Sequence, residues 1–128
     1  MQNAIDWFEI PVADLSRAAT FYAEVLRVEL RRETFGQTEM AVLPYSPAAG
    51  GIGGALVRDA RKRPSADGAV VYLNAGADIR GAVDRALEAG GRVTMPVTDI
   101  GAPGFIALIE DTEGNVVGLH EARAPQSV

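Results

Sequence analysis

The segment IPVADLSRAATFYAEVL, residues 10–26, decides the fold because it passes from a strand to a helix within a few residues. Residues 5–12, IDWFEIPV, are rich in β-branched and aromatic side chains, which predicts a strand. Asp14 then stands where a helix N-cap is expected. The residues after it carry apolar side chains at helical spacing: Leu15, Ala18, Ala19, Tyr22, Val25 and Leu26. The segment therefore predicts a strand followed at once by an amphipathic helix.

The same order recurs in the second half of the chain, which has 128 residues. Residues 69–75, AVVYLNA, predict a strand. Asp78 follows Asp14 by half the length of the chain and is placed to cap a second helix that Gly90 and Gly91 end. Gly54 and Gly118 are separated by the same half-length. We therefore predict two copies of one structural unit.

Each half continues with three further strands. We expect them at residues 28–35, 39–44 and 53–59, and again at 92–97, 104–111 and 115–122. The predicted fold is therefore α+β, with two tandem β-α-β-β-β modules in a single domain spanning 1–128. The modules are expected at about residues 4–59 and 69–122, joined by a linker at about 60–68.

Composition excludes several classes of function. The chain has no cysteine, which excludes disulfides, thiolate metal sites and thiol catalysis. A net charge of −5 argues against nucleic acid as a partner, because phosphates require a basic surface. We find no signal peptide pattern and no apolar run of membrane length, so we expect a cytoplasmic protein with no membrane partner.

Two motifs carry a resemblance to a known family. With IPVADLSRAATFYAEVL near its start and DTEGNVVGLHE at 111–121, the chain resembles the vicinal oxygen chelate superfamily of glyoxalases, bleomycin-resistance proteins and extradiol dioxygenases. Within that superfamily it looks like the glyoxalase-like proteins related to lactoylglutathione lyase. The resemblance implies two modules whose strands form a curled mixed sheet around a cavity. In metal-dependent members, side chains on the first and fourth strands of both modules hold a divalent ion that polarises two neighbouring substrate oxygens.

The metal positions that the resemblance implies fall on unsuitable residues. Counting back seven residues from Asp14 and Asp78 gives Trp7 and Val71, and the fourth-strand positions fall on Gly54 and Gly118. None of these four can ligate a metal through its side chain. We therefore expect no metal and no cofactor, and we predict that true glyoxalase I activity is absent.

A second layer of the implied cavity contains the only histidine of the chain. Residues two apart on a strand share a face, so Glu9, Leu56, Leu73 and His120 are expected together next to the vacant metal positions. Three interpretations stay open for Glu9 and His120: a displaced metal site with too few ligands, an acid–base pair that acts on an organic molecule, or a structural role. Histidine titrates near neutrality and an apolar pocket raises the pKa of a carboxylate, so the pair are the candidate catalytic residues.

Two functions fit these residues. The first is a metal-independent protein that binds a small apolar or aromatic molecule in the cavity between the modules, as in sequestration or resistance. Its candidate ligand-binding residues are Trp7, Met40, Leu56, Val71, Leu73 and Phe105, and Trp7 is equally well explained as plain core. The alternative is a glyoxalase-related lyase or isomerase that uses Glu9 and His120 without a metal. We also expect a homodimer, because exposed sheet edges need covering.

Overall fold

The structure, a computed structural model, describes residues 2–124. It confirms the predicted α+β fold of two β-α-β-β-β modules. A short 3-10 turn, Pro47–Ala49, lies between the third and fourth strands. The elements of the first module are β1 (Trp7–Pro11), α1 (Leu15–Leu26), β2 (Arg31–Phe35), β3 (Thr38–Val42) and β4 (Gly53–Arg58). Those of the second are β5 (Tyr72–Asn74), α2 (Ile79–Glu88), β6 (Arg92–Asp99), β7 (Phe105–Glu110) and β8 (Val116–Glu121).

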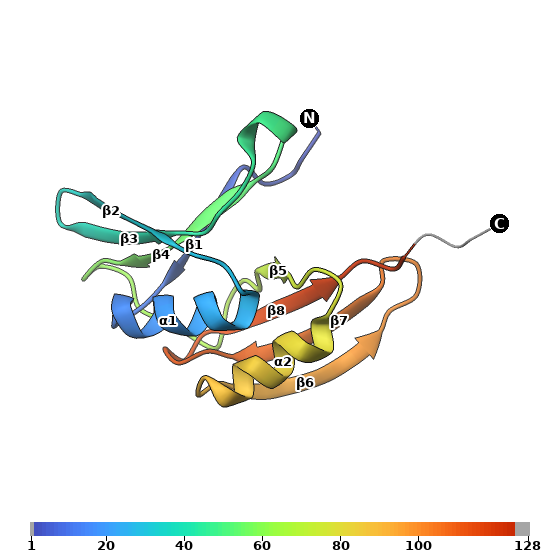
Figure 1. Ribbon diagram of the computed structural model, residues 1–128. Helices are drawn as coiled ribbons and strands as arrows, with labels where there is room; N and C mark the ends of the chain where they lie inside the picture. The colour runs from blue at the N-terminus through green and yellow to red at the C-terminus, as the bar shows by residue number, and fades with distance from the viewer. Residues whose placement is uncertain (1, 125–128) are drawn as a thin grey trace.

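Each module contains one mixed four-stranded sheet. The strand orders are β1-β4-β3-β2 and β5-β8-β7-β6, so the first strand of each module lies at a sheet edge. Within each sheet the first strand pairs in parallel with the last, and the remaining pairs are antiparallel. Figure 1 shows β5 at the edge of its sheet that faces the first module.

The helix ends agree with the sequence prediction. The Asp14 carboxylate accepts the Arg17 N–H at 3.0 Å, and Asp78 accepts the Gly81 N–H at the same distance. At the end of α2, Gly90 has a φ of +100°, a conformation that favours glycine. The Gly91 N–H then donates to the Ala86 carbonyl at 2.8 Å, so the helix ends at the predicted glycines, in a Schellman motif.

The two modules share one apolar core. The helices α1 and α2 lie next to each other and cover the inward faces of both sheets (Figure 1). Phe21 and Tyr22 of α1 are fully buried, with their rings edge to face at 5.1 Å between centroids. The other large buried side chains of this core are Ile10, Val12, Leu15, Val25, Leu56, Leu73, Ile79, Ile109, Val117 and Leu119.

Polar groups of the turn before β8 connect the second module to the first. The Tyr22 hydroxyl donates to the Asp111 carboxylate at 2.6 Å, and burial together with that carboxylate raises the pKa of Tyr22 well above its ordinary value. The Asn115 amide donates to the Pro11 carbonyl at 2.8 Å and accepts the Ser65 N–H at 3.0 Å. This turn, residues 111–115, therefore bonds to β1, α1 and the linker.

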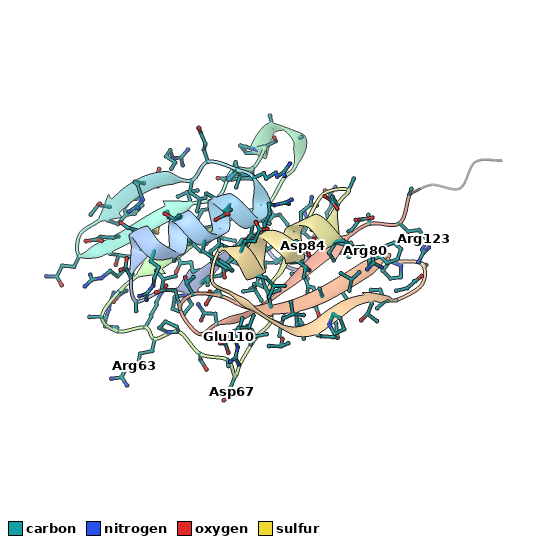
Figure 2. The ribbon with its side chains drawn as sticks, turned by 60° about the horizontal axis from the view of Figure 1, so that its bottom comes forward. Arg63, Asp67, Arg80, Asp84, Glu110 and Arg123 are labelled. Atoms are coloured by element: carbon teal, nitrogen blue, oxygen red, sulfur yellow. The ribbon has the colours of Figure 1, made fainter. Side chains whose placement is uncertain are left out.

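The outer surface is charged. In Figure 2, Arg63 and Asp67 project from the linker away from the body of the protein, and Arg80 and Asp84 stand on the exposed side of α2. Within residues 2–124 no helix is long and apolar enough to cross a membrane.

Candidate functional site

The pairing of β1 with β4 fixes which side chains of the first sheet share a face. Ile10 is opposite Leu56, and both are buried against the helices, on what we call the helix face. Trp7 and Glu9 alternate with Ile10 and therefore lie on the opposite side, the open face. A small separate cluster of apolar side chains lies on the open face: Met40, Val42, Ala55 and Val57.

The second sheet repeats this arrangement. Equivalent strand residues of the two sheets are separated in the sequence by one residue less than half the chain length. The pair Leu73 and Leu119 is buried on the helix face as Ile10 and Leu56 are. The helix caps keep the offset of half the chain, because the second module has one more residue between its first strand and its helix. A shift of one residue turns every strand side chain to the other face.

The predicted layer of Glu9, Leu56, Leu73 and His120 is therefore wrong. Leu56 and Leu73 face the helices, and Leu56 is completely buried in the core, so it lines no cavity. Glu9 lies on the open face of the first sheet, and His120 lies on that of the second, in register with Asn74. None of the four principal hollows among the described residues is lined by both.

Glu9 and His120 each have their own partner. The Glu9 carboxylate accepts from the Lys62 ammonium at 3.1 Å and from the Trp7 indole N–H at 3.3 Å. The His120 Nε2 lies 2.7 Å from the Pro103 carbonyl oxygen, a distance at which the ring donates. The structure thus does not join them into one acid–base pair within a chain.

Aromatic rings occupy the space at the predicted fourth-strand metal positions. A Cβ atom at Gly54 would overlap the Phe8 ring, and one at Gly118 would overlap the Tyr72 ring. Phe8 and Tyr72 are the strand neighbours of these glycines in register. The glycines are thus explained by packing, since only a residue without a side chain leaves room for the ring.

The open faces do not fit the metal that the resemblance implies. We call two residues that are paired in register across the first and last strands of a sheet a layer. On the open faces, each layer contributes at most one strong metal ligand: Glu9 in one layer and His120 in another. Among residues 2–124 no group of three or more histidines and carboxylates is arranged to hold a metal. The paired residues of these layers are Trp7 with Gly53, Glu9 with Ala55, Pro11 with Val57, Tyr72 with Gly118, and Asn74 with His120.

The largest hollow lies between the two modules and has a volume of about 780 Å³. We call it the inter-module cavity. Val71 and Leu73, both predicted ligand-binding residues, lie in its wall, and none of its lining side chains carries a charge. The lining comprises Ile5, Phe8, Leu26, Val28, Leu43, Pro44, Ile52, Gly53, Gly54 and all eight residues from Ala69 to Gly76.

A second hollow of about 500 Å³ lies on the open face of the first sheet. This open-face pocket contains the predicted residues Trp7 and Met40, with the Tyr45 ring edge to face against the indole at 6.0 Å. Its rim is charged: Arg61 bonds to Asp59 at 2.8 Å and holds the pKa of that carboxyl well below its usual range. The other rim pairs are Glu9 with Lys62 and Arg31 with Glu33.

The remaining predicted residue, Phe105, lines neither hollow. It is half-buried against the shared core, and the Arg123 guanidinium lies 4.8 Å from its ring centre. Conversely, sequence reasoning missed Phe8 and Tyr72. The available signal was the combination of a glycine on the last strand with an aromatic residue at the matching position of the first.

Comparison with known proteins agrees with this architecture. Residues 4–119 match the family model described as the Glyoxalase/Bleomycin resistance protein/Dioxygenase superfamily. No curated protein sequence matches the chain.

Several solved structures have a similar fold. A glyoxylase/bleomycin resistance protein/dioxygenase domain from Frankia sp. EAN1pec has a TM-score of 0.73 and 18% identity over 98% of this chain and 96% of that one. A glyoxalase I mutant from Zea mays has a TM-score of 0.68 and 21% identity, over 91% of this chain and 45% of the maize chain. The fosfomycin resistance protein FosX from Listeria monocytogenes has a TM-score of 0.66 and 12% identity, over 99% and 97% of the two chains.

Identities this low show a shared fold and nothing about activity. The family model covers nearly the whole chain and includes the first motif and the second as far as residue 119. The chain belongs to the Glyoxalase/Bleomycin resistance protein/Dioxygenase superfamily.

Proposed function

We propose that the protein binds a small, neutral, apolar or aromatic molecule in the inter-module cavity without the help of a metal. The supporting observation is the lining: about 780 Å³ bordered mostly by aliphatic and aromatic side chains and by backbone, with Asn74 as a polar residue and no charged group. Cavities of this size and character are typical of sites for small organic ligands. A charged ligand would lose its hydration there without gaining an ion pair, which is costly.

Three residues give the cavity its preference for flat or branched apolar molecules. The Phe8 ring lies over Gly54 and presents an aromatic surface, against which a planar ligand can stack. Val71 provides aliphatic surface on the opposite wall, and Leu73, which is 5% exposed, adds a small part of it. Each side chain of this kind that a ligand covers contributes about 1 to 2 kcal/mol of affinity.

The fold alone does not choose between sequestration and catalysis. A protein described as a glyoxalase I and one described as a fosfomycin resistance protein both have it. The choice here depends on the lining of the cavity. The acid–base alternative requires Glu9 and His120 at one ligand, and these residues lie on different sheets with separate partners.

Binding of a neutral apolar fluorophore tests this proposal. N-phenyl-1-naphthylamine fluoresces strongly when it leaves water, so a titration measures its dissociation constant. We expect one saturable site, and about tenfold weaker binding in Ile5→Asp, because that carboxylate enters the cavity wall. Ile100→Asp is the matched control: Ile5 is 47% exposed and Ile100 is 40% exposed, but Ile100 does not line the cavity.

The same titration tests metal independence. After dialysis against a chelator, the dissociation constant of the fluorophore is expected to stay the same, and added zinc or nickel is expected to leave it unchanged. Equal effects of the two aspartate variants, or binding that appears only with metal, would show that the proposal is wrong.

A further inference from the structure

The edge of β5 carries main-chain groups without a strand partner. On one side, the Gly118 N–H donates to the Val71 carbonyl at 2.9 Å, and the Ala75 N–H donates to the His120 carbonyl at 2.8 Å. In a parallel pair, the residues that bond to the neighbour alternate along the strand. The main-chain N–H and C=O groups of Tyr72 and Asn74 therefore point away from β8, and no strand pairs with them within residues 2–124.

The inter-module cavity runs along this edge. Eight consecutive residues, Ala69 to Gly76, line it. A hollow above one face of a strand contacts every second side chain, whereas a hollow beside the edge contacts both sets. The free main-chain groups of Tyr72 and Asn74 therefore face the cavity, opposite the apolar wall that includes Phe8.

We propose that the ligand of this cavity is peptide-like: an extended, neutral, apolar molecule with secondary amides that hydrogen-bonds to Tyr72 and Asn74 as an added strand. This proposal depends on the proposed function, because it assigns a ligand class to the same cavity. Addition of a strand at a free sheet edge is a general mode of peptide recognition, in which main-chain bonds provide affinity and apolar surroundings accept the side chains. The repeat of Tyr72 and Asn74 is two residues, about 7 Å along a strand. The amide groups of an extended polypeptide repeat at the same spacing, so they can pair with both residues.

The alternative of a pure hydrocarbon fits this edge less well. A ligand that fills the cavity removes water from the main-chain groups of Tyr72 and Asn74. If it offers no donor or acceptor in return, each lost hydrogen bond costs about 1 kcal/mol or more. Amides replace these bonds, and they do so without a charge that the lining cannot pair.

The first experiment uses the wild-type protein and needs no variant. The probe is N-acetyl-leucyl-phenylalanine N-methylamide, measured by its displacement of bound N-phenyl-1-naphthylamine. Three analogues each replace one amide N–H by an ester oxygen and keep the same side chains. We expect at least one ester to bind about fivefold more weakly than the amide, because one hydrogen bond is worth about 1 kcal/mol.

The second experiment changes the protein. Asn74→Pro removes the N–H that points into the cavity and leaves the N–H groups that bond to β8, so an edge position such as this tolerates proline. Asn74→Ala is the control, because it loses the side-chain bond to the Gly76 N–H and keeps the main-chain N–H. We expect the amide probe to bind about fivefold more weakly to Asn74→Pro than to Asn74→Ala, after the dissociation constant of the fluorophore has been measured separately for each variant.

The outcomes separate the two proposals. If the fluorophore binds in the cavity but the amide and all three esters displace it equally well, or none displaces it, the peptide-like ligand class is wrong and the proposed function stands. If the fluorophore does not bind, the proposed function fails and this inference fails with it. A selective loss of the amide probe in Asn74→Pro supports the inference, and equal loss in Asn74→Ala contradicts it.

Discussion

Glu113 provides the most demanding test of how the two modules are held together. It lies in the turn before β8, and its carboxylate accepts five hydrogen bonds from α1, from the two residues before α1 and from its own turn. The Ala13 and Asp14 N–H groups donate at 2.9 and 2.8 Å, and the Arg17 guanidinium donates twice, at 2.7 and 3.0 Å. The Thr112 hydroxyl donates at 2.9 Å. We expect Glu113→Gln to weaken the attachment of α1 to the second module.

The magnitude follows from the pKa of this carboxyl. Burial by itself raises the Glu113 pKa, but the bond from Arg17 and those from Asp14, Thr112 and Ala13 outweigh burial and lower it from 4.5 to about 2. At about 1.4 kcal/mol for each pKa unit, the charged form contributes about 3 kcal/mol to stability. The Glu113 side chain is 0% exposed, but the Arg17 side chain is 53% exposed, so solvent screening reduces this contribution to about 2 kcal/mol.

The assay is chemical or thermal unfolding of the whole chain at pH 7. Glu113→Gln is expected to lower the free energy of unfolding by about 2 kcal/mol and the midpoint temperature by about 7 °C. Glu24→Gln is the control. It removes the same charge from an exposed position of α1, and no hydrogen bond or ion pair of Glu24 is found in residues 2–124. We expect it to change stability by less than about 0.5 kcal/mol.

The pH dependence gives an independent check. Because folding lowers the Glu113 pKa, the folded protein binds fewer protons than the unfolded chain between pH 4.5 and about 2. The stabilisation is therefore complete well above pH 4.5 and is lost as the pH falls through about 2. The difference between wild type and Glu113→Gln should shrink along the same range. A difference that stays constant from pH 6 to pH 2, or a variant as stable as Glu24→Gln, would refute the reasoning.

Two further predictions concern the glycines and the open face. Gly118→Ala places a methyl group where the Tyr72 ring lies, so we expect it to lower the unfolding free energy by about 1 to 3 kcal/mol. In a protein that already carries Tyr72→Ala, the same substitution should cost less. Additive effects in this double-mutant cycle would contradict the packing explanation. Phe35 is 65% exposed on the open face of the first sheet. We expect light scattering to find a dimer, and we expect Phe35→Glu to weaken its association about tenfold or more. A wild-type protein that stays monomeric at high concentration would contradict the predicted homodimer.

The order of elements could be predicted from sequence because each signal is local. The capping positions of Asp14 and Asp78 and the stop at Gly90 depend only on residues within one turn of the helix. The spacing of apolar residues in α1 likewise identifies its buried side without knowledge of what covers it. The sequence predicts β2 and β5 too long, because strand-like composition begins before the first residue of each strand.

The faces of the strands could not be predicted from the repeat. The helices of the two modules are related by half the chain length and the strands by one residue less, and no local pattern reveals where the extra residue lies. The apolar residues on both sides of β5, such as Val70 and Val71, allow either phase. Only the pairing with β8 shows that Leu73 is buried and that Tyr72 is not.

This shift changes the meaning of the glycines at 54 and 118. From sequence they are vacant ligand positions in a cavity; in the structure, Gly54 accommodates Phe8 on the helix face, and Gly118 accommodates Tyr72 on the open face. A carboxylate at either position would have to displace a ring, so a metal site at these positions conflicts with the packing of the first strands. The same rings lie in the wall of the inter-module cavity, which has apolar surface and a free strand edge but no ionisable group other than Tyr72. A metal ligand at position 54 or 118 would have to displace the ring of Phe8 or Tyr72. Because both rings line the cavity, the packing that conflicts with a metal site also provides the apolar surface for a neutral molecule.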